Sequence, residues 1–434
     1  MKRKVNIGLI GLGTVGSGVV KILNNKSLDI STKAGADVVI KRIVTKDTKK
    51  AKHIKYNPKI VSKNIDDILN DPDIDIVVEL IGGYEPARTF ILKAIKKGKH
   101  IVTANKAVLA KYWDEIHSQA FKSNKLVYFE AAVGGGIPII QGLNEGLSAN
   151  TIESMYGILN GTTNYILTQM SKEQMSFKDA LKTAQRAGFA EADPTFDIKG
   201  VDSIHKLAIL SAIAYGKLID IKDIYCEGID KIYLEDINFA GKEFNLTLKL
   251  LGIAKHDKNK TEVRVHPTLI PRDHLLASVD NEYNAIYVKG DSAGKTMFYG
   301  KGAGRLAAAS AVVSDIIYTA RHIITGTAGE MPLVTYSRRN KLNVSNIDDL
   351  ESKYYIRFQA DDKPGVLSTI SGILGKYKVS IESCSQKWRS TKYVPIIMLT
   401  HKAKEKNVKT ALNQINKLKA IKAPSIFIRI EDEL

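Results

Sequence analysis

The sequence predicts an α/β chain in three parts: a doubly wound parallel sheet at the N-terminus, a central α+β domain, and a C-terminal domain of ferredoxin-like order. Three observations support this prediction. A glycine-rich turn directly follows the first apolar segment, strand-like and helix-like segments then alternate, and a β-α-β-β-α-β pattern fills the last part of the chain. The length of 434 residues also favours more than one domain.

The composition is that of a globular protein without a membrane span. Hydrophobic residues make up 44% and charged residues 25% of the chain, and no apolar run reaches membrane-spanning length. The net charge of +18 would suit a nucleic-acid partner, but the lysines are scattered and no zinc-finger or basic-zipper spacing occurs. We therefore expect small anionic ligands, and neither nucleic acid nor membrane as a partner.

Two features indicate the cytoplasm. Cys226 and Cys384 lie far apart and in no C-x-x-C pattern, as is typical of reduced thiols. The basic and then apolar N-terminus resembles a signal peptide, but repeated glycines from Gly8 to Gly18 argue against a helical apolar region. We expect a cytoplasmic protein.

The first element is a strand over Val5–Ile10, followed by a G-x-G-x-x-G turn and a helix. Gly11 permits the tight turn, Gly13 lets a pyrophosphate approach the backbone, and Gly16 lets the helix pack on the strand. This context predicts a Rossmann-type dinucleotide site, whereas a ligand-free turn is the alternative. The expected cofactor contacts are Gly11, Leu12, Gly13, Thr14, Val15 and Gly16.

Further strands alternate with helical stretches, which predicts a parallel sheet. The helix that is clearest in this part of the sequence covers Ala87–Lys97. The expected strands are Asp37–Val44, Ile74–Leu80, His100–Thr103 and Lys125–Phe129.

The choice of dinucleotide is read after the second strand of the chain, Asp37–Val44, where NAD sites usually carry an acid and NADP sites offer cations. Lys46 precedes Asp47 here, so NADP(H) is favoured and NAD(H) is the alternative. Simple exposed lysines would give the same pattern. Thr103 ends the predicted strand His100–Thr103 and Lys106 follows it, at the sheet edge that binds ligands. Lys106 is either a cofactor or substrate contact or a solvated loop lysine.

The segment from Gly188 to Lys206 concentrates charge ahead of an apolar helix. Glu191 and Asp197 precede a helix that begins at Val201 and is apolar nearly all round, which is typical of a buried helix. Asp202 and Lys206 lie four residues apart and therefore share one face of it. The pair is either a structural ion pair or part of the catalytic machinery of an active site.

Two glycine-containing loops lie between these regions. The stretch Glu130–Pro138 holds three consecutive glycines and could bind a phosphate or a cation, or act as a hinge. The stretch Asn160–Thr163 reads as a strand-to-helix turn, whose free amides suit a carboxylate or a carboxamide.

Taken together, these motifs resemble the homoserine dehydrogenase family over essentially the whole chain. The resemblance is carried, in order, by GLGTVGSG, TANK, EAAVGGGIP, LNGTTNYIL, GFAEADP, GVD and YGKGAGRLAAASAVVSDI. Ser203-Ile204-His205 is a minor departure from the family, in which many members carry small residues and an arginine before the lysine that matches Lys206. The resemblance implies NAD(P)-dependent interconversion of homoserine and aspartate 4-semialdehyde, by a single-function enzyme of threonine, methionine and isoleucine biosynthesis.

The resemblance also implies roles for individual residues. Lys206 matches the acid/base lysine, Asp202 the carboxylate beside the reacting oxygen, and Lys106 the second active-site lysine. Glu191 and Asp197 match substrate-pocket acids. The remaining matches are the turn Gly161 and Thr162 for the substrate carboxylate, the cofactor contacts Thr103 and Gly302, and a sodium site from Glu130, Val133, Gly135 and Ile137.

This chemistry suits the residue types. The ammonium of an amino-acid aldehyde needs an acidic partner, which Glu191 supplies. Hydride delivery to the carbonyl carbon leaves negative charge on the oxygen, which a protonated lysine can neutralise. Because an ordinary lysine has a pKa of about 10.4, reduction of the aldehyde is the easier direction at neutral pH.

The C-terminal part resembles an ACT domain. Its strands and helices follow the order β-α-β-β-α-β, and D-K-P-G-V-L is the turn of that family. The resemblance implies an amino-acid effector, with threonine as the end product, bound by Asp362, Gly365, Val366 and Leu367. A module used only for oligomerisation is the alternative.

We expect a nucleotide-binding domain over 1–132, completed by about 302–328. A substrate and dimerisation domain over 133–301, a linker over 329–350 and the ACT domain over 351–434 follow. The expected assembly is a homo-oligomer, either a dimer or a tetramer. Two other functions fit less well: another ACT-bearing amino- or hydroxy-acid dehydrogenase, and a sensor that binds NADPH and threonine without turnover.

Overall fold

The computed structural model describes residues 3–47, 57–257, 260–328, 342–386 and 393–434. Contacts divide the chain into two compact units. The first comprises 1–161, 202–224 and 282–342, and the second comprises 162–201, 225–281 and 343–434. Each unit therefore draws on segments that are far apart in the sequence.

The first unit contains a six-stranded sheet in the order β3-β2-β1-β4-β5-β6, with every pair parallel. This is the Rossmann order, and the predicted doubly wound sheet is confirmed. The strands are β1 (Lys4–Ile10), β2 (Asp37–Val44), β3 (Val61–Ser62), β4 (Ile76–Glu79), β5 (His100–Thr103) and β6 (Val127–Tyr128). The last is shorter than the predicted Lys125–Phe129.

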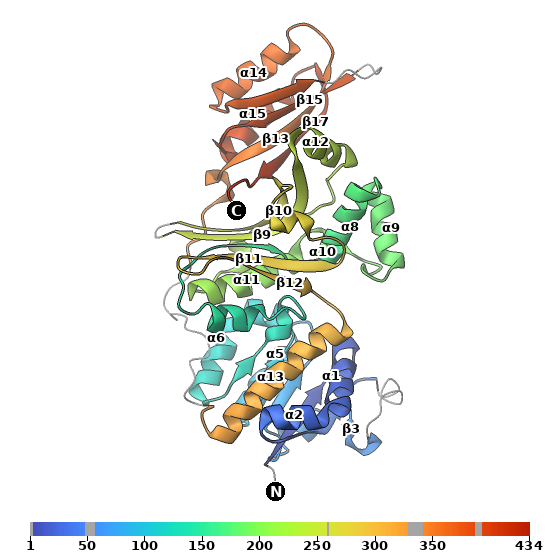
Figure 1. The fold of residues 1–434 in the computed structure, drawn as a ribbon, viewed down its shortest axis with the longest axis vertical. Coiled ribbons are helices and arrows are strands. Elements are labelled where there is room, and N and C mark those ends of the chain that lie inside the picture. Colours follow the sequence, from blue (N-terminus) through green and yellow to red (C-terminus); the bar gives the residue numbers. More distant parts are fainter. Residues whose placement is uncertain (1–2, 48–56, 258–259, 329–341, 387–392) are drawn as a thin grey trace. The chain divides into compact units, whose positions relative to one another are not determined.

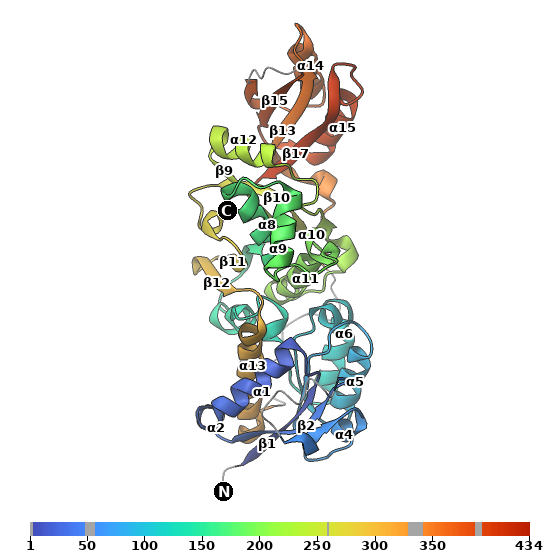
Figure 2. The same cartoon turned by 90° about the vertical axis from the view of Figure 1, so that its right-hand side faces the viewer.

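Helices cover both faces of this sheet (Figures 1 and 2). On one face α13 packs beside α1, and Ala309, Val312 and Ile316 share one apolar core with Val5 and Ile7 of β1. The helix α13 comes from late in the chain. The helices of this unit are α1 (Thr14–Asn25), α2 (Ser27–Ala34), α4 (Asp66–Leu69), α5 (Ala87–Lys96), α6 (Lys106–Lys122), α7 (Ile139–Gln141) and α13 (Arg305–Thr325).

The first unit also contains three antiparallel strands and most of one buried helix. Strand β11 (Tyr283–Gly290) pairs with β7 (Ile152–Ile158) on one side and β12 (Gly294–Lys301) on the other. Helix α11 spans Val201–Tyr215 and is buried from Asp202 to Ala212. The predicted buried helix is therefore confirmed.

The second unit begins with a helical group and a long hairpin. The twelve-residue strands β9 (Leu246–Asp257) and β10 (Lys260–Pro271) pair antiparallel, and β8 (Tyr225–Cys226) runs parallel to β10. The helices are α8 (Gly161–Lys172), α9 (Phe177–Arg186), α10 (Thr195–Ile198) and α12 (Leu234–Phe244).

The C-terminal module has the predicted β-α-β-β-α-β order. Helices α14 and α15 cover one face of its sheet (Figure 1), where their apolar residues pack on Tyr354, Ile356 and Phe358. The short β16 is an addition to the predicted pattern. The elements are β13 (Glu351–Asp361), α14 (Val366–Lys376), β14 (Ile381–Gln386), β15 (Tyr393–Thr400), β16 (Ala403–Lys404), α15 (Glu405–Ile415) and β17 (Ile421–Ile430).

Strand β17 joins this module to the hairpin. It pairs antiparallel with β13 and parallel with β10, through Thr268↔Arg429 and Leu269↔Ile430. The module and the hairpin therefore share one sheet within the second unit.

The domain boundaries drawn from the sequence stay a prediction, and most of the expected linker falls on 329–341, outside the described residues. In the parts of the chain that the structure describes, no helix is long and apolar enough to cross a membrane.

Candidate active site

The glycine-rich turn has the geometry of a dinucleotide-binding loop. Gly11 has a φ of +98°, and a Cβ on Gly16 would lie 2.1 Å from the Gly11 carbonyl oxygen. A Cβ on Gly13 would meet nothing within 4 Å, so that side of the loop is open to a ligand. Because α1 begins directly afterwards at Thr14, its free amides suit a phosphate.

This loop borders a pocket of about 550 Å³ in the first unit. Lys46 and Asp47 line it after β2, and Lys63 adds a second cation. The predicted contacts Gly11, Leu12 and Gly13 therefore share a pocket with Lys46. The other lining residues are Ile10, Val44, Thr45, Asn64, Ile65, Leu80, Ile81, Gly82, Glu85, Pro86 and Phe90.

The buried Glu79 carboxylate anchors the loop after β5. The Thr103 hydroxyl donates to Glu79 at 2.7 Å and accepts from the Asn105 amide at 3.0 Å. Asn105 then caps α6 by accepting from the Val108 amide. Burial raises the pKa of Glu79 despite these hydrogen bonds. This network fixes the start of α6, and Lys106 is its first residue.

Asp202 lies between two lysines. Its carboxylate is 2.7 Å from the Lys206 Nζ through Oδ2 and 2.8 Å from the Lys106 Nζ through Oδ1. Asp202 and Lys206 are only 3% and 8% exposed. The first unit thus brings together the three residues that the sequence proposes for catalysis, although Lys106 and Asp202 are far apart in the chain.

Two further groups complete this cluster. The Lys206 Nζ donates to the Leu159 carbonyl at 2.6 Å, and the Asn160 Nδ2 donates to Asp202 at 2.9 Å. Burial alone would raise the pKa of Asp202, but the ammonium groups of Lys206 and Lys106 outweigh it and hold that pKa well below its usual range. The carboxylate is therefore ionised at neutral pH and fixes both cations.

Sequence reasoning missed the contacts of Leu159 and Asn160 with α11. The sequence assigns the amides of the turn Asn160–Thr163 to a ligand and gives no sign of a contact with Asp202 or Lys206. His205, next to Lys206, is 4% exposed and burial lowers its pKa. Its burial indicates a packing role.

The loop after β6 surrounds a buried carboxylate. Both oxygens of Glu130 accept backbone amides, from Ile140 at 2.8 Å and Gln141 at 2.9 Å. Burial raises the pKa of Glu130 to about 7. The described residues offer no cluster of three His, Cys, Asp or Glu side chains.

Glycines fix the path of this loop. Gly135 has a φ of +56°, and a Cβ there would lie 2.6 Å from the Gly302 carbonyl oxygen. A Cβ on Gly302 would in turn lie 2.0 Å from the Asn284 side chain. Val133 and Ile137 are buried on either side of the glycines. Gly302 therefore packs against the Glu130 loop and is not among the residues that line the dinucleotide pocket.

The substrate residues proposed from the sequence lie in or beside the second unit. Gly161 starts α8, and a Cβ there would lie 2.6 Å from the Glu282 carbonyl oxygen, so only glycine fits. The next residue, Thr162, donates its hydroxyl to the Phe189 carbonyl at 2.6 Å, which ties α8 to the acidic segment. Glu191 is exposed and Asp197, on α10, is partly buried.

Asp193 has a local role. Its Oδ1 accepts from the amide and the hydroxyl of Thr195, at 3.1 and 2.6 Å, and so starts α10. These two hydrogen bonds give Asp193 a structural role in the turn ahead of α10.

The expected effector turn precedes α14. Gly365 has a φ of +86° and a Cβ there would meet nothing within 4 Å, while Leu367 is 41% exposed. Asp362 accepts from Gln386 on β14 at 3.4 Å. Val366 is the first residue of α14. The four residues therefore form one surface around the N-terminus of this helix.

Family models match three consecutive parts of the chain. Residues 11–130 match the homoserine dehydrogenase NAD binding domain, 138–317 match homoserine dehydrogenase, and 354–420 match the ACT domain. Together these matches cover the dinucleotide turn, the Lys206 cluster and the C-terminal module.

Whole-chain comparisons agree. The homoserine dehydrogenase of Neisseria gonorrhoeae is 44% identical over 432 residues, which is 99% of each chain. A homoserine dehydrogenase structure from Thiobacillus denitrificans superimposes with a TM-score of 0.94 at 44% identity and covers 100% of both chains. A hyperthermophilic archaeal homoserine dehydrogenase in complex with NADPH has a TM-score of 0.62 at 26% identity and covers 73% of this chain and 97% of its own. The chain therefore belongs to the homoserine dehydrogenase family, whose members are NAD(P)-dependent oxidoreductases.

Proposed function

We propose that this chain reduces aspartate 4-semialdehyde to homoserine with NADPH, and that Lys206 is the acid that protonates the new alcohol. The observation that carries the proposal is the buried Asp202 carboxylate held between two ammonium groups, at 2.7 and 2.8 Å. A fixed cation with a proton to give is what a developing alkoxide needs.

The bound dinucleotide supplies the hydride. Lys206 then faces the carbonyl oxygen, stabilises the charge that develops on it and donates a proton from Nζ. Asp202 and the Leu159 carbonyl hold Lys206 in one orientation, so that little reorganisation is needed during the reaction. Lys106 contacts the other carboxylate oxygen of Asp202 and adds positive charge beside the reacting oxygen.

We assign the substrate ammonium to Glu191, a further place in the substrate pocket to Asp197, and the substrate carboxylate to the amides of Gly161 and Thr162. The exposed Glu191 side chain and the helix start at Gly161 support these assignments.

The assay that tests the proposed function follows NADPH absorbance with aspartate 4-semialdehyde and, in parallel, with other amino- and hydroxy-acid carbonyl substrates. We expect the semialdehyde to be reduced with the highest kcat/KM. A preference for another substrate would favour a different dehydrogenase, and binding of NADPH without turnover would favour the sensor.

Two lysines in the dinucleotide pocket support a preference for NADP(H) over NAD(H). Lys46 follows β2, where the adenosine ribose is expected, and Lys63 lines the same pocket. The archaeal relative of known structure is in complex with NADPH. Asp47 lines the pocket as well, so the preference is a matter of relative affinity.

The substitution Lys46→Glu is expected to raise the KM for NADPH by about tenfold, the effect of losing about 1.4 kcal/mol of phosphate attraction. The KM for NADH should change much less, because NADH lacks the 2′-phosphate. Initial rates with both dinucleotides measure this. Lys21→Glu, on the exposed side of α1, is the control for the change in net charge. Equal effects on both cofactors would contradict the NADP preference.

We propose that Glu130, with the carbonyls of Val133, Gly135 and Ile137, binds a sodium ion. The buried Glu130 carboxylate and the left-handed turn at Gly134 and Gly135 support this proposal. The ion would be structural, because it would tie the end of the parallel sheet to α7.

Sodium should raise the thermal unfolding midpoint more at pH 8 than at pH 5. The folded pKa of Glu130, about 7, lies above the unfolded value of about 4.3. The folded state therefore binds more protons between these values, and stability falls as pH rises through this window. A bound cation offsets that fall. Choline chloride controls for ionic strength. Sodium should give no such pH-dependent gain in Glu130→Gln, and an equal gain in that variant would argue against this site.

We further propose that the ACT module binds threonine at Asp362, Gly365, Val366 and Leu367, and that binding inhibits the enzyme. This regulation suits a homo-oligomeric, cytoplasmic enzyme of threonine, methionine and isoleucine biosynthesis. The exposed turn before α14 supports a ligand surface.

Saturating threonine is expected to lower the rate of semialdehyde reduction, and Asp362→Ala should weaken threonine binding measured by calorimetry. Light scattering would report any change in subunit assembly, and would separate dimer from tetramer. Unchanged activity and assembly in saturating threonine would contradict the regulatory proposal and favour a purely structural module.

A further inference from the structure

The segment Tyr225–Glu227, called the strip below, contacts both the segment around α10 and the C-terminal module. It runs beside β10, with Tyr225 opposite Arg264 and Cys226 opposite Val265. The Glu227 amide then donates to the Val265 carbonyl at 2.8 Å. The strip is therefore anchored along the hairpin.

One side of the strip supports the segment that carries Asp197. The Cys226 thiol donates to the Lys199 carbonyl at 3.1 Å, and the Ile229 amide donates to the Ile198 carbonyl at 2.9 Å. A Cβ on Gly228 would lie 2.2 Å from that same Ile198 oxygen. Because the backbone around Gly228 packs closely against Ile198 and Lys199, we expect a shift of the strip to move the residues next to Asp197.

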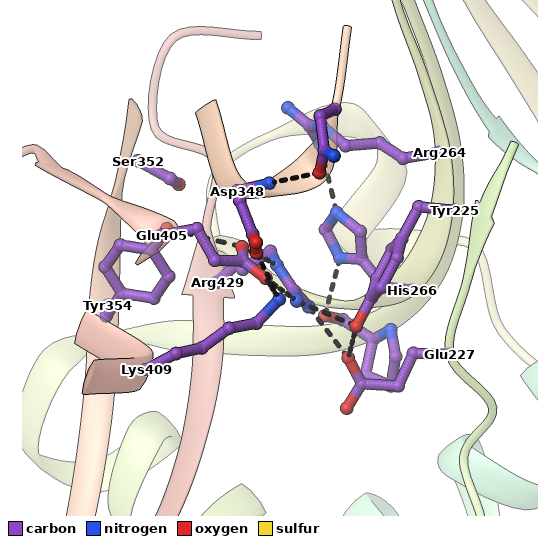
Figure 3. Close-up of polar contacts among 12 residues, drawn as sticks. Tyr225, Glu227, Arg264, His266, Asp348, Ser352, Tyr354, Glu405, Lys409 and Arg429 are labelled. Carbon is purple, nitrogen blue, oxygen red and sulfur yellow. Dashed lines mark hydrogen bonds and ion pairs between the residues drawn. The ribbon is translucent and has the colours of Figure 1, made fainter. Parts of the chain in front are cut away.

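The other side of the strip is held by an arginine of the C-terminal module (Figure 3). Arg429 of β17 is 1% exposed, and its guanidinium donates to Glu227 at 2.8 Å and to the Tyr225 hydroxyl at 3.1 Å. The Tyr225 hydroxyl in turn donates to Glu227 at 3.1 Å. The buried Arg429 guanidinium therefore holds both ends of the strip, Tyr225 and Glu227.

The guanidinium is itself fixed from α15. Glu405 accepts two hydrogen bonds from Arg429, both at 2.6 Å, and Lys409 lies 3.0 Å from the same carboxylate. Lys409 also donates to Asp348 at 2.9 Å (Figure 3). Arg429 thus bridges a rigid acid in the module and a half-exposed acid on the strip.

We propose that Arg429 and Glu227 are positioning residues for substrate binding, acting through the strip on the segment that holds Asp197. The inference rests on the proposed substrate role of Asp197. It predicts an effect on KM for the semialdehyde and not on kcat, because Lys206 has its own anchors at Leu159 and Asp202.

The test is Glu227→Gln, which removes the charge on the exposed side of Arg429 and leaves the Glu405 pair in place. We expect the KM for the semialdehyde to rise on the order of tenfold, which corresponds to about 1.4 kcal/mol of binding free energy. The kcat and the KM for NADPH should stay within twofold. Glu227→Asp, which keeps the charge, should recover part of the loss.

Two controls make the outcome decisive. Glu433→Gln breaks an exposed ion pair with Lys402 in the same module and should leave the KM unchanged. Asp197→Asn tests the proposed substrate residue directly. If it raises the KM while Glu227→Gln does not, the positioning inference is overturned and the substrate assignment stands. If only Glu227→Gln raises it, the strip acts through another residue of the segment. If neither does, both are wrong.

Discussion

The variant Lys206→Ala will reduce aspartate 4-semialdehyde with a kcat lower by about 10²- to 10⁴-fold, the usual contribution of a general acid. The loss should fall on kcat more than on the KM for NADPH, because Lys206 lies in the Asp202 cluster and does not line the dinucleotide pocket. Single-turnover NADPH oxidation, followed by absorbance, separates the chemical step from product release.

Lys106 is the competitor for the same role, since its ammonium contacts the other oxygen of Asp202. A larger kcat loss in Lys106→Ala than in Lys206→Ala would reverse the assignment of the acid. Lys289→Ala is a matched control, because this exposed lysine pairs with the exposed Glu153 at 2.8 Å in the same unit. An unimpaired Lys206→Ala variant would remove Lys206 from the mechanism.

The second large effect is expected on stability. Glu405 is 0% exposed and holds the buried Arg429. Among the described residues, Glu405→Ala therefore leaves this guanidinium with Glu227 as its remaining acid partner. Breaking a buried ion pair on one side typically costs about 3–5 kcal/mol. We expect a loss of that size in urea unfolding followed by circular dichroism. Glu153→Gln, which breaks an exposed pair, should cost at most about 1 kcal/mol.

The pH dependence of that loss has a definite sign. Burial alone would raise the pKa of Glu405, but the hydrogen bonds and charge of Arg429 and Lys409 lower it below its ordinary value. A depressed carboxyl pKa stabilises the fold above the unfolded value of about 4.3. The gap between wild type and Glu405→Ala should therefore be complete at pH 7 and should close as pH falls below that value. A gap that is the same at pH 3 and pH 7 would show that lost packing, and not the ion pair, is responsible.

Local patterns predicted the parallel sheet well because each signal lies within a few residues. Strands β2 and β5 coincide with the predicted Asp37–Val44 and His100–Thr103, and α11 begins at Val201 as expected. Boundaries were less exact at β6, where only Val127–Tyr128 pair in the sheet. The apolar pattern there continues beyond the residues that find a partner strand.

The site was predictable where the family resemblance supplied it and not where contacts join distant segments. Lys106 and Asp202 meet although nothing between them marks the pairing. Asn160 reaches Asp202 over 42 residues of sequence. Arg429 gave no signal either, because it sits between Ile428 and Ile430, all three buried, and no alternation marks it as polar. Such contacts depend on tertiary packing, which periodicity does not encode.

The place of β17 between β10 and β13 bears on how the proposed threonine regulation could be lost in nature or by design. A stop codon before residue 421 would leave two neighbouring strands without their shared partner and would expose both edges to aggregation. Feedback-resistant forms should therefore arise by single changes on the α14 turn, with the final strand kept intact. An engineer who wants a deregulated enzyme should edit that turn and leave the C-terminus in place.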